Sequence, residues 1–512
     1  MMKTKSLMIQ GTASSSGKSL IAAALCRILF QDGFKVAPFK AQNMSNNSFV
    51  TTEGMEMGRA QVVQAYAAGL APDVRMNPVL LKPSSDTGAQ VVLNGKPSFT
   101  MHACDWHQTR DKLRDTVREC YRSISNEFEV MIIEGAGSPA EINLKKNDIV
   151  NMGMAQMADA PVVIVGDIDR GGVFASLVGT VQLLEPYERQ RVKGFIINKF
   201  RGDVELLKPG LDQLTQITKI PTLGVIPWLD HSIDDEDGVT EWFHSKNDVK
   251  KEIDICIIRL PHVSNFTDFL PLEHVPGVAV RWCSRAEKIG NPDLLILPGT
   301  KATVSDLRAI KKNGVAESII SFTNNGGAVL GVCGGFQMLG NCIKDEHQVE
   351  SSVQFETGLK LLDMETGFLP EKRTAQIDVK VFGDQNALFD GLDAYLAKGY
   401  EIHMGESTFG SGSCPFTVSY DKDGTEYVSG ITDKTGRVSG SYVHGLFDSG
   451  KIVCNVINKL RRLKGLMPID ISADDRSVTF EAQINRLAAV CRETLDIPKI
   501  YEIISVSNRT NN

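Results

Sequence analysis

The segment SLMIQGTASSSGKSLIAAALCRIL, residues Ser6–Leu29, predicts the opening of a parallel α/β domain. A continuous apolar run leads into a loop of small residues, and a helical pattern then begins at Gly17-Lys18-Ser19. Backbone N–H groups in such a loop and at a helix N-terminus attract anionic phosphates. The loop also follows the carboxyl end of a strand, where open α/β sheets bind their ligands. We therefore expect a phosphate-binding loop at this turn.

The loop departs in one position from the strict GxxxxGK[ST] pattern. That pattern requires glycine at position 12, where this chain has Thr12, and the glycine stands at Gly11 instead. In a phosphate-binding loop Lys18 reaches the β- and γ-phosphates and Ser19 holds Mg²⁺. The alternative is a Gly/Ser turn before an amphipathic helix. The place of the loop after the first strand favours a nucleotide site that includes Gly17, Lys18 and Ser19.

Further apolar runs in the N-terminal half repeat the pattern of the first strand. Together they predict six strands: Ser6–Gln10, Lys35–Phe39, Val130–Ile133, Val162–Val165, Gly194–Asn198 and Thr222–Ile226. Each run is continuous rather than alternating, as expected of strands buried on both faces of a parallel sheet. Helical patterns between several of them predict a doubly wound α/β domain of the P-loop NTPase type over residues 1–235.

A second domain is predicted after an acidic, helix-poor stretch, DHSIDDEDGVTEW, and a charged run, SKNDVKKE. We expect residues 236–250 to be a linker. Strand patterns resume at Ile253–Pro261, Gly277–Cys283, Asp293–Thr300, Gly327–Cys333 and Val438–Phe447. They predict a second doubly wound α/β domain over residues 251–450. A helical pattern that includes Ile452–Leu463 opens a C-terminal helical extension, residues 451–512.

Polar residues stand at the carboxyl ends of three further N-terminal strands. Glu134 ends one of them and is a candidate second contact to Mg²⁺. Asp167 and Asp169 follow the next, and Asn198-Lys199 ends another, where a purine can be read. Each alone is equally well explained as a capping carboxylate or a strand-end turn. Because the carboxyl ends of parallel strands meet at one edge of a sheet, we expect a nucleotide site along this edge.

The stretch AVLGVCGGFQMLG, residues Ala328–Gly340, places Cys333 between a strand and a helical pattern. This arrangement predicts a nucleophile elbow in cysteine form, with glycines that permit strained dihedral angles. The Gly334 N–H can donate to an oxyanion, and the helix dipole favours a thiolate. The loop LPGTKAT, with Gly299, can complete the oxyanion hole. The alternative is a buried packing thiol, which we expect at Cys26, Cys120, Cys256 and Cys342.

A thiolate nucleophile needs a base, and His444 in SGSYVHGLFD is the candidate. The order of cysteine and histidine, both at strand ends, resembles class I glutamine amidotransferase domains, which implies a flavodoxin-like fold and release of ammonia from glutamine. That family has an acidic residue two positions after the histidine, where this chain has Leu446. We therefore expect a Cys–His dyad. Nearby side chains that can orient the histidine or bind glutamine are Glu401, His403 and Glu406.

Composition limits the remaining classes. The 512 residues are 42% hydrophobic and 23% charged, which is ordinary for a globular protein, and the net charge of −7 gives no reason to expect nucleic-acid binding. No apolar stretch reaches the roughly 18 residues of a membrane span. The ten cysteines include no CxxC pair, which favours reduced thiols in a cytoplasmic protein over disulfides or a zinc ribbon.

Several longer motifs together resemble one family from about residue 5 to residue 490. They are GTASSSGKS, KAQNMSNNS, EGAGSPAEINLKKNDIVNMGMA, VGDIDRGGVFAS, LGVCGGFQMLG, GYEIHMGES and YVHGLF. On these motifs the chain is similar to cobyric acid synthases, glutamine-dependent amidases of cobalamin biosynthesis, whose subfamily shares the leucine two positions after the histidine. The N-terminal half also resembles dethiobiotin synthetase, whose phosphate loop is similarly irregular.

The resemblance implies a glutamine-dependent carbon–nitrogen ligase with two sites, whose substrates are a corrinoid, glutamine and ATP. Cys333 and His444 would hydrolyse glutamine, and the ammonia would reach the N-terminal domain. There ATP with Mg²⁺ would activate the b, d, e and g carboxylates of adenosylcobyrinic acid a,c-diamide as acyl phosphates, and amidation would give adenosylcobyric acid. The expected substrate-side residues are Lys40, Gln42, Asn43 and Asp148.

Two alternatives stay open. One is the related synthase that makes the a,c-diamide itself and shares both domains; KAQNMSNN and GDIDRGG favour cobyric acid synthase over it, by resemblance only. The other is a P-loop ATPase of the partition type with a non-catalytic amidotransferase-like domain. It predicts that the Cys333→Ala substitution has no effect on function.

Overall fold

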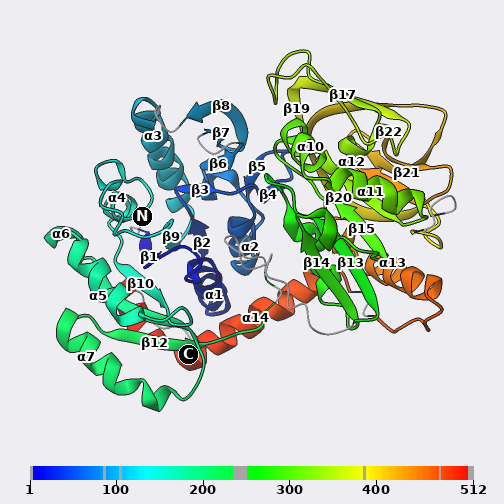
Figure 1. Cartoon of the computed structure of the whole chain (residues 1–512). Coiled ribbons are helices and arrows are strands. Elements are labelled where there is room, and N and C mark those ends of the chain that lie inside the picture. Colours follow the sequence, from blue (N-terminus) through cyan, green and yellow to red (C-terminus); the bar gives the residue numbers. More distant parts are fainter. Residues whose placement is uncertain are drawn as a thin grey trace.

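The computed structural model of the chain describes residues 4–84, 88–102, 106–231, 233, 251–383, 388–471 and 474–505. Two α/β lobes stand side by side, and the last long helix runs from the second lobe back to the first (Figure 1). The linker predicted at residues 236–250 lies outside the described residues. Within the described ranges, no helix is long and apolar enough to cross a membrane.

A six-stranded parallel sheet forms the centre of the N-terminal lobe, in the order β12-β11-β10-β1-β9-β2. Its strands are β1 (Lys5–Gly11), β2 (Val36–Phe39), β9 (Val130–Glu134), β10 (Val162–Asp167), β11 (Val192–Phe200) and β12 (Thr222–Pro227). All six correspond to strands predicted from the sequence. Leu7 and Ile9 pack into one apolar cluster and Met8 into another, because successive side chains point to opposite faces. Burial on both faces explains the continuous apolar runs.

Helices cover this sheet, and a small second sheet adjoins it. The helices are α1 (Lys18–Gln31), α2 (Arg59–Ala67), α3 (Trp106–Ser125), α4 (Met152–Ala158), α5 (Val173–Leu183), α6 (Pro186–Arg189) and α7 (Lys208–Thr218). The second sheet contains β3 (Gln42–Met44), β6 (Val79–Pro83), β7 (Gly88–Leu93) and β8 (Lys96–His102). A hairpin of β4 (Ser48–Val50) and β5 (Glu56–Gly58) extends from this lobe and contacts the second lobe.

The parallel part of the second lobe has the order β14-β13-β15-β16-β23. The strands are β13 (Ile253–Ile258), β14 (Val278–Cys283), β15 (Leu294–Leu297), β16 (Val329–Val332) and β23 (Val438–Ser441). Counted along the chain, this order is the flavodoxin-like 2-1-3-4-5. The helices that precede β23 are α9 (Leu270–Glu273), α10 (Thr303–Lys312), α11 (Val315–Asn324) and α12 (Gly334–Leu339). The five strands and the fold agree with the prediction.

A mainly antiparallel extension of this sheet was not predicted. Its strands are β17 (Cys342–Lys344), β18 (Phe355–Thr357), β19 (Met364–Val381), β20 (Tyr395–Phe409), β21 (Ser413–Tyr420) and β22 (Glu426–Asp433). Exposed, half-buried and buried residues mix along β19 and β20. Such strands lack the continuous apolar signal of the parallel ones, so their sequence does not predict them.

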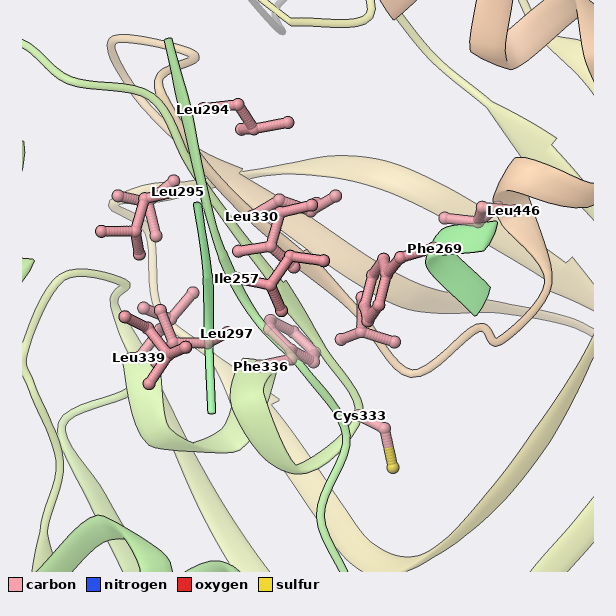
Figure 2. Packing of buried hydrophobic residues seen from close by; sticks show 14 of the residues in the cluster. Ile257, Phe269, Leu294, Leu295, Leu297, Leu330, Cys333, Phe336, Leu339 and Leu446 are labelled. Carbon is pink, nitrogen blue, oxygen red and sulfur yellow. The ribbon is translucent and has the colours of Figure 1, made fainter. Parts of the chain in front are cut away.

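An apolar cluster lies beneath the carboxyl edge of the second sheet (Figure 2). Leu297, Leu330 and Phe336 are fully buried within it, and Cys333 lies at its margin. Since each fully buried side chain of this kind contributes about 1.5–3 kcal/mol, the cluster provides a rigid base for the turn that carries the cysteine.

The C-terminal helices divide between the two lobes. Helix α13 (Gly450–Leu463) packs against β13 and α9 of the second lobe. Helices α14 (Arg476–Thr494) and α15 (Ile497–Ile504) return to the first lobe, where they contact α1, β12 and β1 (Figure 1). Their buried residues Ile484, Cys491 and Ile500 belong to the same cluster as Leu7 and Ile9. The end of the chain therefore completes the core of the N-terminal lobe.

Candidate active sites

Cys333 occupies a sharp turn between β16 and α12. Its backbone has φ 50° and ψ −109°, a region that residues other than glycine rarely adopt. A Cβ at Gly334 would lie 2.7 Å from Thr300 Cγ2, and a Cβ at Gly335 would lie 2.1 Å from the Leu297 carbonyl oxygen. The two glycines therefore permit close packing of the elbow against the loop that follows β15. The strand, sharp turn and helix that the sequence predicts are present, and the role of Cys333 as nucleophile stays a prediction.

His444 follows β23 and lies on the same edge of the sheet. Its Nδ1 is 2.6 Å from Oδ2 of Asp268, and both side chains are buried. Burial by itself would lower the pKa of His444, but the charges of Asp268 and Cys333 outweigh it and raise that pKa to about 10. An imidazole held in this way keeps Nδ1 on the carboxylate and turns Nε2 away from it.

The carboxylate partner of His444 differs from the predicted dyad. Asp268 comes from a short 3-10 helix, η5 (Phe266–Phe269), which follows β13. Leu446 is buried in the apolar cluster with Phe269, so the usual position of the carboxylate is an apolar packing site (Figure 2). Glu401 of β20 does not take the role either, because it bonds Arg373 and His403.

Sequence reasoning missed Asp268 because 176 positions separate it from His444. The available signal was a carboxylate within the apolar segment VSNFTDFL, directly after a predicted strand. A carboxylate in such a place is expensive to bury without a partner. The partner itself cannot be read from the segment.

The charge of Cys333 acts on the imidazole, so the thiol and the imidazole lie close together. Among the described residues, His444 Nε2 has no hydrogen-bond partner. The Cys333 thiol points to the carbonyl oxygen of Ile402, at 3.7 Å. A Cβ at Gly299 would lie 3.0 Å from Cε1 of His444, so the second predicted oxyanion residue also borders the site.

Several polar side chains beside the elbow were not predicted. Glu350 accepts hydrogen bonds from the Val304 N–H at 3.0 Å and from the Thr303 hydroxyl at 3.2 Å. Burial raises the pKa of Glu350 to about 7. Lys301 belongs to the glycine loop, and burial together with neighbouring Lys372 lowers the pKa of its ammonium group. The ammonium group of Lys301 therefore lies near the thiol of Cys333, and Glu350 is held beside it at the start of α10.

The phosphate loop of the N-terminal lobe has the form that its sequence predicts. Gly17 has φ 94°, and Lys18 extends back so that its Nζ donates to the carbonyl oxygen of Ala13 at 2.9 Å. Asn198 donates from Nδ2 to the carbonyl oxygen of Ser16, also at 2.9 Å. A Cβ at Gly17 would lie 2.0 Å from this nitrogen, so Asn198 supports the loop from below.

Glu134 lies at the centre of the N-terminal site. Its Oε1 accepts from Ser19 Oγ at 2.8 Å and from Lys40 Nζ at 2.9 Å. Its Oε2 accepts from Gln64 Nε2 at 2.5 Å and from Gln61 Nε2 at 3.4 Å. One carboxylate and one hydroxyl fit Mg²⁺, which takes one or two carboxylates together with phosphate oxygens and water. In the described part of the chain, no group of three or more His, Cys, Asp and Glu side chains could hold a metal ion.

Three other residues predicted for the N-terminal site, Asn43, Lys199 and Gln42, each lie in a different environment. Asn43 donates from Nδ2 to Gln61 Oε1 at 3.0 Å, which brings it to the site around Glu134. Lys199 pairs with Asp167, so it borders the strand ends. Gln42 precedes Asn43 on β3, and its Oε1 is buried without a hydrogen-bond partner among the described residues.

Asp148 has a local structural role. Its carboxylate accepts hydrogen bonds from the backbone N–H groups of Val150, Asn151 and Gly153, at 2.8, 2.8 and 2.9 Å. These groups stand at the beginning of α4, where an acceptor side chain satisfies unpaired donors. The structure therefore gives Asp148 a capping function.

A cavity of about 760 Å³ lies between the lobes. Its lining includes Phe49 and Tyr66 of the first lobe, Tyr400 of the second, and Phe480 of α14. Residues 59, 62, 63 and 66 of α2 face the cavity, whereas Gln61 and Gln64 bond Glu134. Because these positions lie on different faces of the helix, α2 separates the cavity from the carboxylate.

Two family models match the chain. The CobQ/CobB/MinD/ParA nucleotide binding domain covers residues 7–238, and the CobB/CobQ-like glutamine amidotransferase domain covers residues 254–452. The chain is thus a glutamine amidotransferase joined to a nucleotide-binding domain.

Curated relatives identify the family within this class. The chain is 47% identical to the cobyric acid synthase of Thermoanaerobacter sp. (strain X514), over 97% of this chain and 98% of the relative. It is 49% identical to that of Yersinia enterocolitica, over 98% of each chain. The chain belongs to the cobyric acid synthase family, and it is an ATP-dependent glutamine amidotransferase of cobalamin biosynthesis.

Proposed function

We propose that the chain amidates the b, d, e and g carboxylates of adenosylcobyrinic acid a,c-diamide to give adenosylcobyric acid. Cys333 and His444 hydrolyse glutamine for this purpose, with Asp268 as the positioning residue. The observation that carries the proposal is the elbow cysteine beside a histidine whose Nδ1 is 2.6 Å from a buried carboxylate. The N-terminal lobe of the same chain supplies the phosphate loop for ATP, which activates the carboxylate that ammonia attacks.

The glutaminase reaction begins with attack of the Cys333 thiolate on the amide carbon of glutamine. Backbone N–H groups of Gly334 and Gly299 stabilise the oxyanion. The His444 imidazolium gives its proton to the leaving nitrogen, so ammonia departs and a thioester remains. His444 then takes a proton from water, the hydroxide attacks the thioester, and glutamate leaves as the thiolate reforms. The charge of Asp268 stabilises the imidazolium in both steps.

Recognition of glutamine falls to the charged pair beside the elbow. Free glutamine carries an α-carboxylate and an α-ammonium group. Lys301, which lies near Cys333, can bind the α-carboxylate. Glu350, which accepts hydrogen bonds from Thr303 and Val304, can bind the α-ammonium group. A pair of this kind selects the free amino acid over a glutamine side chain within a protein.

In the N-terminal lobe, a corrin carboxylate oxygen attacks the γ-phosphorus of ATP, and ADP leaves. Ammonia then attacks the acyl phosphate, the C–N bond forms, and inorganic phosphate leaves. Lys18 and Lys40 neutralise phosphate charge, while Asn198 holds the loop backbone in place. Ser19 and Glu134 would hold Mg²⁺, which would supply positive charge to neutralise the phosphates. Gln42 and Asn43 are the residues we assign to the corrinoid side.

Reduced thiols support a cytoplasmic location for this chemistry. All nine cysteines that the structure describes are free, and most are buried. Proteins of oxidising compartments commonly pair their cysteines. We therefore propose that the protein is cytoplasmic.

Mass spectrometry of the corrinoid product tests the proposal. With glutamine and ATP, adenosylcobyrinic acid a,c-diamide should gain four amides, and cobyrinic acid should not be turned over. Turnover of cobyrinic acid alone would instead assign the chain to a,c-diamide synthesis. The Cys333→Ala variant should lose glutamine-dependent amidation and retain ammonia-dependent amidation. Full glutamine hydrolysis by this variant would refute the nucleophile assignment.

A further inference from the structure

The short helix that carries Asp268 is held by the N-terminal lobe. The Asn265 N–H donates to the carbonyl oxygen of Asn46 at 3.4 Å, and the Ser48 N–H donates to Asn265 Oδ1 at 3.3 Å. The Thr267 hydroxyl donates to Oδ1 of Asn47 at 3.0 Å. Three consecutive residues of one lobe therefore bond the residues on the amino-terminal side of the aspartate in the other lobe.

Asn265 connects this contact to the ring of His444. It has φ 49°, and its Nδ2 donates to the hydroxyl of Tyr400 at 2.8 Å. The Tyr400 ring stacks on the His444 ring with centroids 5.2 Å apart and an angle of 16° between planes. A change in the docking of residues 46–48 would therefore shift both Asp268 and Tyr400, and with them the imidazole of His444.

The same segment begins at the nucleotide site. Asn43 donates to Gln61 at 3.0 Å, and Gln61 in turn donates to Glu134 at 3.4 Å. From Asn43 the chain needs only a few residues to reach Asn46–Ser48. Hydrogen bonds and one short stretch of backbone thus join the proposed Mg²⁺ carboxylate to the carboxylate that orients the base.

Unpaired polar atoms are concentrated in this stretch. Gln42 Oε1, Asn46 Oδ1 and Asn47 Nδ2 are buried and have no hydrogen-bond partner among the described residues. A buried polar atom without a partner destabilises the fold, so proteins rarely keep several such atoms together. A second arrangement of residues 42–47, adopted when substrates are bound, would give these atoms partners.

The end of the segment has a fixed anchor. Lys82 Nζ donates to Ser48 Oγ at 3.0 Å and pairs with Glu56, and Glu56 also pairs with Lys372 of β19 at 2.6 Å. These three charged side chains are buried at the contact between the lobes. The anchor holds Ser48 in place while the preceding residues remain incompletely bonded.

We propose that residues 42–48 form a relay through which occupancy of the N-terminal site aligns Asp268 and so controls glutamine hydrolysis. Asn47, Asn265 and Thr267 are positioning residues of this relay. It rests on the proposed glutaminase role of Cys333 and His444. The consequence is that ATP and the corrinoid together accelerate hydrolysis, which prevents loss of ammonia when no acceptor is present.

Glutamate formation, measured with and without ATP plus the corrinoid, tests the relay in the full-length chain. Thr267→Val keeps the side-chain shape and removes the hydrogen bond to Asn47. Stimulation should fall by at least roughly threefold through kcat, with KM for glutamine and ammonia-dependent amidation unchanged. The matched control is Thr432→Val, because Thr432 is equally buried in the same lobe but bonds only within it. It should keep wild-type stimulation.

A double-mutant cycle makes the test independent of folding defects. Asn47→Ala removes the same hydrogen bond from the other side, and the ratio of glutamine- to ammonia-dependent amidation is the measured quantity. The double variant should lose no more of this ratio than either single variant, because one shared contact has been removed. Additive losses would overturn the relay, and so would an unstimulated wild type. If Cys333→Ala kept glutamine hydrolysis, the proposed function itself would fail, which is a distinguishable result.

Discussion

Replacing Asp268 by asparagine keeps the shape of the side chain and removes its charge from His444. The carboxylate lies 2.6 Å from Nδ1, and the pKa of His444 is raised from 6.5 to about 10. This shift of about 3.5 pKa units corresponds to about 5 kcal/mol in favour of the imidazolium. Without the charge of Asp268, burial lowers the pKa of His444 and only Cys333 still raises it, so the imidazolium that accompanies the thiolate is less stable. We expect kcat for glutamine hydrolysis to fall on the order of 10²–10⁴-fold.

The assay is steady-state glutamate formation from about pH 6 to about pH 10, with ammonia-dependent amidation as the parallel measurement. Since Asp268 raises the pKa of His444, activity that requires the imidazolium persists to high pH in the wild type. The alkaline limb should move to lower pH in Asp268→Asn. Ammonia-dependent amidation should stay unchanged.

Asp254→Asn is the matched control. Asp254 pairs with Arg281 and lies near the amino end of β13, whereas Asp268 follows the carboxyl end of that strand. The control variant should hydrolyse glutamine at the wild-type rate. The reasoning would be refuted if Asp268→Asn kept a rate within roughly threefold of the wild type, or if glutamine- and ammonia-dependent rates fell equally.

Three further substitutions test the phosphate site, the lobe contact and the elbow. Glu134→Gln should lower ammonia-dependent amidation at least roughly 10²-fold, while glutamate formation without ATP is retained. Burial would raise the pKa of Glu56, but the two lysines hold it well below its usual range, so its contribution to stability is present above about pH 4.3 and lost as pH falls. Glu56→Gln should therefore cost about 3–5 kcal/mol in urea unfolding at pH 7 and flatten the loss of stability towards pH 3; an equal loss at both pH values would contradict this. Gly335→Ala, with its Cβ 2.1 Å from a backbone oxygen, should lower Tm by about 3–10 °C, unlike Gly367→Ala, which has open space; equal Tm values would contradict the steric argument.

Local patterns were enough to predict the parallel strands and the strand–turn–helix conformation at two turns, the one before Lys18 and the one at Cys333. A strand buried on both faces is a continuous apolar run, and Ser6–Gln10 and Val130–Ile133 show this within a few residues. The phosphate loop and the elbow at Cys333 are equally local, because a sharp turn between a strand and a helix requires small residues at the turn itself. The antiparallel strands β19 and β20 were missed because their half-buried sequence lacks this signal.

Contacts between distant segments required the folded chain. Asp268 and His444 come together because β13 and β23 belong to one parallel sheet and both end at the same edge. Gln64 reaches Glu134 because α2 packs against α1. A hydrogen bond depends on positions within a few tenths of an ångström, and the sequence separation of its partners gives no information on that scale.

The conformations of the elbow and the phosphate loop are therefore determined by the sequences of short segments. The identity of the orienting carboxylate, the docking of residues 46–48 on η5 and the return of α14 to the first lobe belong to the assembled molecule. The physical reason is that backbone conformation depends on neighbouring residues, whereas the partner of a buried charge depends on how complete elements pack.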